Sequence, residues 1–133
     1  MNEWIEKYIG IPYLSHGASF GAVDCFGLIR LVYQNERGVT LNVFEYGDAD
    51  DSADVCRAIE DNKGDEWRRI KQPEQGCVLL LNVKGYATHC GLYVGENRML
   101  HSIKGCNSCI EKTNGLRWKS RIEGYYRYVG GSQ

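Results

Sequence analysis

The chain has 133 residues, with 16 basic and 17 acidic side chains spread along its length. This length predicts a single domain, residues 1–133, large enough to bury a hydrophobic core. The formal net charge of −1 without a basic stripe argues against a nucleic-acid partner, and no apolar run approaches the roughly 20 residues needed for membrane insertion. The N-terminus lacks the basic and apolar regions of a secretory signal, so we expect synthesis in the cytoplasm without a signal peptide.

The first third of the chain predicts two helices. Apolar residues recur at helical spacing over residues 4–9, and the Gly- and Ser-rich segment 15–23 predicts a loop. Asp24 is a good N-cap for a helix over residues 25–37, whose apolar residues fall on one face. Gly38 is suited to the C-terminal end of that helix.

The rest of the chain predicts one more helix and then a series of strands. An irregular segment, 39–51, precedes a helix over residues 53–63. An almost unbroken apolar run over 76–83 predicts a buried central strand. The later predicted strands are a hairpin, 88–95 with 98–103, and two single strands, 109–113 and 125–129. This order predicts an α+β domain with N-terminal helices packed on a mostly antiparallel sheet.

Cys25 is the first residue of the helix that Asp24 caps. A chain of this size does not need disulfides to fold, so we expect its six cysteines to be mostly reduced. At the first helical position, the Cys25 sulfur would lie near unpaired backbone N–H groups and the positive end of the helix dipole, which both favour a thiolate. Cys25 is therefore either a nucleophile or, as many free cysteines are, a small buried side chain.

A nucleophilic thiol needs a base, and the chain has three histidines: His16, His89 and His101. His89 and His101 fall on the two strands of the predicted hairpin, where an odd-length turn or a bulge would make them neighbours on one face. One ring nitrogen of His89 could then face the sulfur while the other bonds to His101. Each histidine could instead satisfy a local backbone group. His16, in the loop before the helix, could approach Cys25 from the other side.

The motifs also occur in a familiar order. GIPY, DCFGL, GCVLLL, THCGLYVG and MLHS together resemble the NlpC family of papain-like cysteine peptidases, which cleave bacterial cell-wall peptides. The resemblance covers residues 4 to about 129 and extends to phage tail-assembly members, whose short chains similarly read D-C-x-G-L-[IV]-R-x-V-Y. It implies a papain-like α+β fold and a cysteine endopeptidase that needs no cofactor or metal.

The resemblance also implies roles for single residues. Cys25 would be the nucleophile, His89 the general base and His101 the third, orienting residue of the site. Tyr13 matches a tyrosine that lines the active site in this family. The residues that we expect near the substrate are Tyr13, Asp24 and His16. The implied substrate is the peptidoglycan stem peptide, often cut between D-γ-glutamyl and the following diamino acid. The implied setting is a phage or prophage tail acting at the host cell wall, with tail-tip proteins as possible partners.

Three alternatives remain open from the sequence. Cys106 and Cys109 form a C-x-x-C pair that could, with Cys90 and His101, hold zinc. A tail protein could also keep this fold as a structural or assembly component without enzymatic activity. Finally, the thiol could pass an acyl group to an acceptor other than water, as a transferase or an amidase would.

Overall fold

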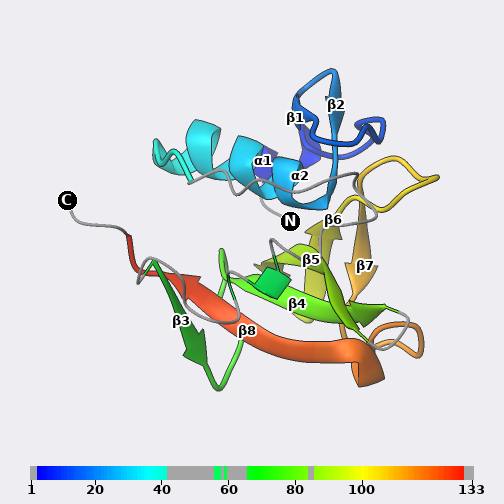
Figure 1. Cartoon of the computed structure of the whole chain (residues 1–133). Coiled ribbons are helices and arrows are strands. Elements are labelled where there is room, and N and C mark those ends of the chain that lie inside the picture. The colour runs from blue at the N-terminus through cyan, green and yellow to red at the C-terminus, as the bar shows by residue number, and fades with distance from the viewer. Residues whose placement is uncertain (1–2, 42–55, 58, 60–65, 84–85, 131–133) are drawn as a thin grey trace.

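The two N-terminal helices lie over one face of a β-sheet (Figure 1). The computed structural model describes residues 3–41, 56–57, 59, 66–83 and 86–130. Its helical elements include α1 (Glu3–Glu6), α2 (Cys25–Val32), a π-helical turn (Tyr33–Arg37) and a 3-10 helix (Lys119–Arg121). The π-helical turn ends at Gly38, whose φ of 66° lies in the left-handed region that glycine adopts most easily.

Six antiparallel strands form the main sheet, in the order β3-β8-β4-β5-β6-β7. Their bounds are β3 (Trp67–Ile70), β4 (Val78–Val83), β5 (Tyr86–Gly95), β6 (Arg98–His101), β7 (Cys109–Lys112) and β8 (Ile122–Tyr128). A separate small hairpin, β1 (Ala18–Ser19) and β2 (Ala22–Val23), precedes α2. Strands β4 to β7 form a meander, and β8 returns to pair with β4 (Figure 1).

Strand β4 is central because both of its faces are buried. Val78 and Leu80 belong to the core beneath α2, whereas Leu79 and Leu81 belong to a second cluster on the opposite face. Side chains alternate between the faces of a strand, so a strand buried on both sides needs a nearly continuous apolar run. The strand predicted over 76–83 is confirmed.

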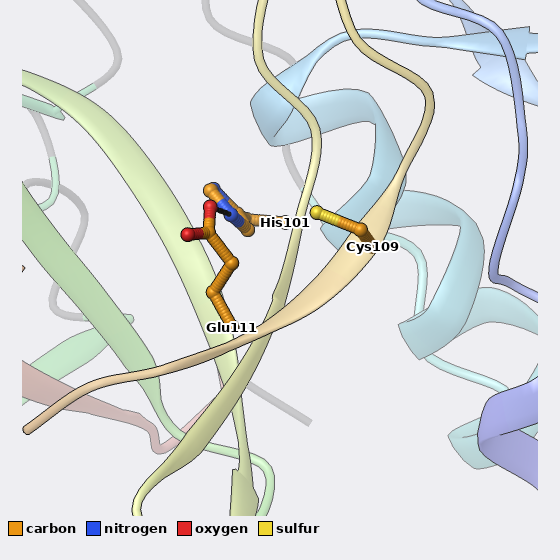
Figure 2. Close-up of side chains that lie close together, drawn as sticks. All are labelled: His101, Cys109 and Glu111. Atoms are coloured by element: carbon orange, nitrogen blue, oxygen red, sulfur yellow. Dashed lines mark hydrogen bonds and ion pairs between the residues drawn. The ribbon is translucent and has the colours of Figure 1, made fainter. Parts of the chain in front are cut away.

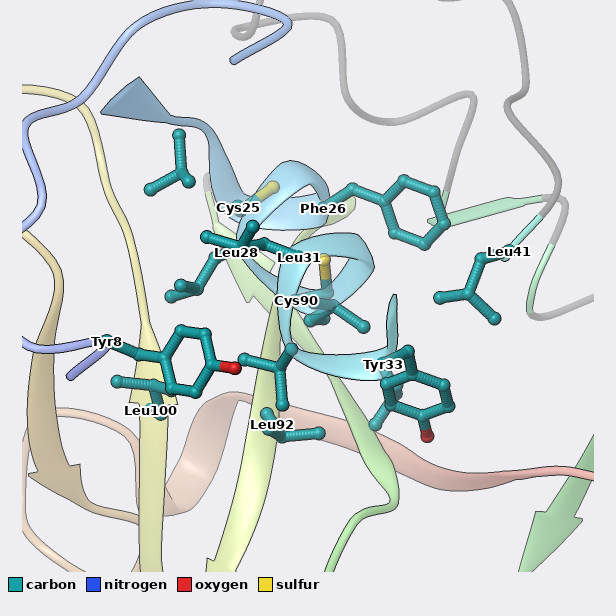
Figure 3. Packing of buried hydrophobic residues seen from close by; sticks show 14 of the residues in the cluster. Tyr8, Cys25, Phe26, Leu28, Leu31, Tyr33, Leu41, Cys90, Leu92 and Leu100 are labelled. Carbon is teal, nitrogen blue, oxygen red and sulfur yellow. The ribbon is translucent and has the colours of Figure 1, made fainter. Parts of the chain in front are cut away.

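The core beneath α2 fixes this helix against the two strands that contain the candidate histidines. Figure 3 shows Leu28 and Leu31 of α2 near Cys90 and Leu92 of β5 and Leu100 of β6. All five side chains are buried. The start of α2 is therefore positioned by packing against β5 and β6.

The predicted α+β arrangement, with N-terminal helices on an antiparallel sheet, is confirmed. The predicted hairpin corresponds to β5 and β6, and its turn residues Glu96 and Asn97 both have positive φ, at 55° and 59°. Two successive residues with positive φ are the mark of a type I′ turn, whose twist suits a two-stranded hairpin. The strands predicted near the C-terminus correspond to β7 and β8.

Two features differ from the sequence-based prediction. Residues 15–23, predicted as a loop, contain β1 and β2, and the segment between residues 63 and 76, for which no strand was predicted, contains β3. The pairing of β3 with β8 is long-range, as in Trp67 opposite Tyr128, so local patterns do not reveal it.

Part of the prediction falls outside the described residues. Most of the helix predicted over 53–63 does so, although Cys56, Arg57 and Ile59 are helical, and so do residues 42–51 of the segment predicted as irregular. No helix in the described part of the chain is both long and apolar enough to cross a membrane.

Candidate active site

Asp24 connects the first turn of α2 to the loop before it. Its Oδ1 accepts a hydrogen bond from the backbone N–H of Gly27 at 2.7 Å, and its Oδ2 accepts one from the backbone N–H of His16, also at 2.7 Å. The residue is only 1% exposed. Asp24 is thus the expected N-cap and also fixes the loop, whereas its contact with substrate stays a prediction.

Two glycines let that loop pass directly against the helix. A Cβ on Gly27 would lie 1.7 Å from the carbonyl oxygen of Gly17, a distance that no side chain tolerates. The same Gly17 oxygen accepts the backbone N–H of Asp24 at 3.0 Å. The glycine of the DCFGL motif therefore has a steric role, which holds the residues around Cys25 in place.

Cys25 is the first residue of α2 and is 5% exposed. Contacts with Cys25 and Cys56, together with complete burial, raise the pKa of the Cys90 thiol well above its usual value. Cys90 therefore stays protonated beside the sulfur of Cys25. Because Cys90 directly follows His89 in β5, Cys25 lies next to the strand segment that contains the predicted base.

His89 and His101 are in direct contact. Nε2 of His89 lies 2.8 Å from Nδ1 of His101, and both residues are buried. In the β5–β6 register, Leu92 is opposite Leu100 and Tyr93 is opposite Met99, which places the histidines diagonally on the same face. The expected proximity of the two histidines is therefore observed, while their catalytic roles stay predictions.

Two residues not considered in the sequence analysis extend this contact. His101 Nε2 lies 2.7 Å from Oε1 of Glu111, and Nη1 of Arg117 lies 3.2 Å from the same oxygen. Met99 pairs directly with Glu111 across β6 and β7, so Glu111 is on the face that also holds His101. The only sequence signal that could have placed Glu111 near His101 is the alternation of side chains in the strand predicted over 109–113. We call His89, His101 and Glu111 the histidine relay.

The charge of Glu111 fixes the direction of the histidine relay, that is, which ring nitrogens donate and which accept its hydrogen bonds. Burial of Glu111 favours its protonated form, but contacts with Trp118 and His101 outweigh this effect and hold its pKa below the usual value. Burial, followed by the nearby His89, lowers the pKa of His101 to about 4, so its ring is neutral near pH 7. An ionised Glu111 can only accept, so His101 donates through Nε2 and accepts through Nδ1.

This direction has a consequence for His89. Because Nδ1 of His101 accepts, Nε2 of His89 must be the donor in the bond between the two rings. The lone pair of a neutral His89 is then on Nδ1, at the far side of the ring from His101. His89 can therefore serve as a proton acceptor, and Glu111 sets its tautomer through His101.

Trp118 covers both imidazole rings. Its indole stacks on His89, with centroids 5.6 Å apart, and meets His101 edge-on at 5.4 Å. The ring is 1% exposed, and its N–H approaches Glu111 without reaching ordinary hydrogen-bond geometry. Trp118 therefore shields the two imidazole rings from water and limits their rotation.

The other predicted site residues surround the start of α2. Tyr13 is half-buried and forms a β-bridge with Val23, two residues before Cys25. Ser102, directly after His101, donates a hydrogen bond to the carbonyl of Val23 at 3.4 Å, which joins the end of β6 to the approach to α2. His16 is exposed and has a positive φ of 66°. Contacts of Tyr13 and His16 with substrate stay predictions.

The zinc site considered from the sequence is not assembled. Cys90 is in the core beneath α2, on the opposite face of the sheet from His101, because it alternates with His89 along β5. Instead, Figure 2 shows Cys109 near His101 and Glu111. The ligand atoms of these three residues lie within 4.8 Å of one another.

The comparison with protein families extends over most of the chain. The profile of the NlpC/P60 family matches residues 10–127. Gamma-DL-glutamyl hydrolase of Bacillus subtilis is 27% identical over 124 residues, which are 92% of this chain and 27% of that protein. Murein DD-endopeptidase MepS/murein LD-carboxypeptidase of Escherichia coli strain K12 is 21% identical over 112 residues, which are 84% of this chain and 53% of that protein. The chain thus spans about a quarter of the length of the Bacillus subtilis relative and about half of the length of the Escherichia coli relative.

Solved structures show the same fold at low sequence identity. An NlpC/P60 family protein from Bacillus cereus superposes with a TM-score of 0.68 at 21% identity, over 92% of this chain and 37% of that one. RipD from Mycobacterium tuberculosis, described as a non-catalytic NlpC/p60 domain protein adapted to peptidoglycan binding, gives 0.60 at 17% identity, over 94% and 91%. The papain-like fold is confirmed, and the expected enzyme class, a cysteine peptidase, is that of the family. This chain belongs to the NlpC/P60 family.

Proposed function

We propose that this chain hydrolyses an amide bond in peptidoglycan stem peptides, with Cys25 as nucleophile and His89 as general base. The observation that supports this most strongly is the histidine relay, which leaves a proton acceptor on His89, in the strand segment whose next residue, Cys90, contacts Cys25 at the start of α2. His101 acts as the orienting residue, and Glu111 orients His101 in turn. Cys25 and His89 are thus the catalytic pair, and the other two are positioning residues.

The first half of the reaction forms a thioester. Nδ1 of His89 takes the proton of the Cys25 thiol, and the sulfur attacks the carbonyl carbon of the scissile amide. The negative charge on the substrate oxygen is stabilised by backbone N–H groups at the start of α2, including that of Cys25. His89 then gives its proton to the leaving nitrogen, and the C–N bond breaks.

The second half of the reaction releases the acid product. His89 removes a proton from a water molecule, which attacks the thioester carbonyl. The C–S bond breaks, and the sulfur recovers the proton from His89. The product is a free carboxylate, and the enzyme returns to its starting state with no cofactor consumed.

The proposed bond lies between D-γ-glutamyl and the following diamino acid of the stem peptide. This choice is supported by the resemblance to the NlpC family and by the name of the Bacillus subtilis relative, a gamma-DL-glutamyl hydrolase. The Escherichia coli relative is named as an endopeptidase and carboxypeptidase of murein, so the substrate class has broader support than the bond.

We also propose that the protein works in a phage or prophage tail and acts at the host cell wall. The support is the segment DCFGLIRLVY, which matches the pattern of tail-assembly members of the family. In this setting the virion would deliver the domain to the cell wall. Immunodetection of the protein in purified tail particles would test the proposal, and its presence only in the soluble fraction of induced cells would contradict it.

The hydrolase proposal is tested by mass spectrometry of defined muropeptides. The wild-type protein, Cys25→Ala and the matched control Cys106→Ser would each be incubated with a stem tetrapeptide that contains the γ-glutamyl bond. We expect the wild type and Cys106→Ser, which changes an exposed thiol, to cleave this bond at similar rates. We expect Cys25→Ala to be inactive.

Other results would each favour a different function. Cleavage at another amide bond would keep the reaction class and overturn the γ-glutamyl assignment. Products joined to an added amine would indicate a transferase. Binding of muropeptides by the folded wild type without cleavage would indicate a non-catalytic role, of the kind described for RipD.

A further inference from the structure

We propose that His101, Cys109 and Glu111 form a site for a thiophilic divalent cation such as Zn²⁺, and that the bound cation switches off the hydrolase by reversing the histidine relay. The inhibition rests on the proposed function, whereas the binding does not. The cation would not need to contact Cys25 or the substrate. It would act through the hydrogen bond between the two histidines.

The three side chains are assembled by adjacent strands. His101 in β6 is directly opposite Cys109 in β7, and Glu111 lies two residues further along the same face of β7. Their ligand atoms lie within 4.8 Å of one another, and in Figure 2 the Cys109 sulfur is directed toward His101. A small shift of side chains, without movement of the strands, would bring all three atoms to bonding distance of one ion.

The donor set suits zinc. An imidazole nitrogen, a thiolate and a carboxylate are the three ligand types that Zn²⁺ takes from proteins, and a water molecule can complete a tetrahedral site. His101 is buried, but Cys109 is half-buried and the Glu111 side chain is 25% exposed, so an ion can enter from solvent. Binding releases one proton, from the Cys109 thiol.

Metal binding and the active form of the histidine relay are mutually exclusive. In the active form Nε2 of His101 carries the proton that is donated to Glu111. A metal on Nε2 moves this proton to Nδ1 of His101, which becomes the donor to His89. Nε2 of His89 must then accept, and its proton moves to Nδ1. His89 now presents an N–H group instead of a lone pair and cannot take the proton of Cys25.

Arg117 is the competing cation at this site. Its guanidinium pairs with Glu111 at 3.2 Å, and the Arg117 side chain is 54% exposed. An exposed ion pair is weak in water, so the arginine can leave when a divalent cation arrives. Removing the arginine charge should therefore strengthen zinc binding, which is the opposite of what a purely structural role for this pair would give.

Binding is measured first, without activity, in a Cys25→Ala background. Zinc chloride would be titrated into the protein in competition with a chromophoric zinc indicator. We expect one equivalent to bind, and Cys109→Ser to weaken binding by about tenfold or more, since it removes one of three protein ligands. Cys106→Ser, the matched control in the same C-x-x-C pair, should leave the affinity within about twofold. Arg117→Gln should tighten binding.

Equal losses of zinc affinity in Cys106→Ser and Cys109→Ser would indicate a C-x-x-C site and overturn the proposal, as would zinc binding by Cys109→Ser as tight as in the parent protein.

Inhibition is then measured with Cys25 restored. We expect zinc to inhibit muropeptide cleavage in the wild type and in Cys106→Ser, and about tenfold more zinc to be needed in Cys109→Ser. If the same zinc concentration inhibited the wild type, Cys106→Ser and Cys109→Ser equally, the metal would act at Cys25 itself, which would contradict the relay mechanism. If the protein binds zinc but cleaves no muropeptide, the proposed function fails while the metal site stands.

Discussion

Replacing Glu111 by leucine removes the charge that sets the direction of the histidine relay. The Glu111 carboxylate accepts from His101 at 2.7 Å, and hydrogen bonds to a charged group contribute about 1.5–3 kcal/mol. Without it, the wrong His101 tautomer is no longer disfavoured, and part of the population presents an N–H group on Nδ1 of His89. Equal populations of the two tautomers would by themselves lower kcat/KM only about twofold, but Glu111 also supports, through His101, the positive charge that His89 gains when it takes the thiol proton. A loss of about 2 kcal/mol of this transition-state stabilisation corresponds to a decrease of about 30-fold in kcat/KM.

Glu111→Gln is the informative second variant. The glutamine oxygen can accept from His101 as the carboxylate does, but its NH₂ group can also donate and so favour the reversed tautomer. In serine peptidases an amide in place of the orienting carboxylate is harmful for this reason. We expect Glu111→Gln to retain a fold like that of the wild type and to lose activity in proportion to the reversed tautomer.

The assay combines kinetics with a direct view of the tautomers. Muropeptide hydrolysis gives kcat/KM, and ¹⁵N chemical shifts of the histidine rings report which nitrogen of His101 carries the proton. Glu74→Leu is the matched control because it removes another Glu–Arg ion pair, with Arg127 at 2.8 Å, outside the histidine relay. A change in the His101 tautomer in Glu111→Leu with kcat/KM within about twofold of the wild type would refute the reasoning.

Three further predictions concern the stability of the fold. Burial lowers the pKa of His101 from 6.5 to about 4. Between these pH values the unfolded chain therefore binds more protons than the folded protein. The free energy of unfolding should fall by up to about 3 kcal/mol as the pH drops from 6.5 to 4. His101→Gln should flatten this decline, and an unchanged slope in chemical denaturation would contradict it. Gly27→Ala should cost about 3 kcal/mol or more, because the added Cβ would meet Gly17 at 1.7 Å, whereas Gly21→Ala, with 3.5 Å of space, should unfold at nearly the wild-type temperature. Asp24→Ala should cost about 1–2 kcal/mol through loss of the N-cap, and equal stability of the two proteins in urea would show that the cap is dispensable.

Much of the fold could be predicted because its signals are local. The Asp24 cap and the apolar face that follows it define α2, and the apolar run at Val78–Val83 defines the central strand. The hairpin turn at Glu96 and Asn97 has a short-range cause as well. These features depend on residues close to one another in the sequence, which is why their patterns are informative.

The parts that were not predicted depend on contacts between distant residues. Strand β3 has the mixed pattern WRRI and gains its place by pairing with β8 at the C-terminal end of the chain. Glu111 and Trp118 lie in segments with no catalytic motif, and only the folded sheet brings them to His101. Cys90 was considered as a metal ligand together with His101, but strand alternation places the two on opposite faces.

The central claim is that the histidine relay activates Cys25, and the most direct measurement is competitive alkylation of the thiols. The wild type and His89→Ala would be treated at pH 7 with limiting iodoacetamide, and the labelled cysteines would be identified by mass spectrometry. We predict that Cys25, although 5% exposed, reacts faster than the exposed Cys106 in the wild type and loses this advantage in His89→Ala. Faster labelling of Cys106 in the wild type, or a Cys25 rate that does not depend on His89, would contradict the account.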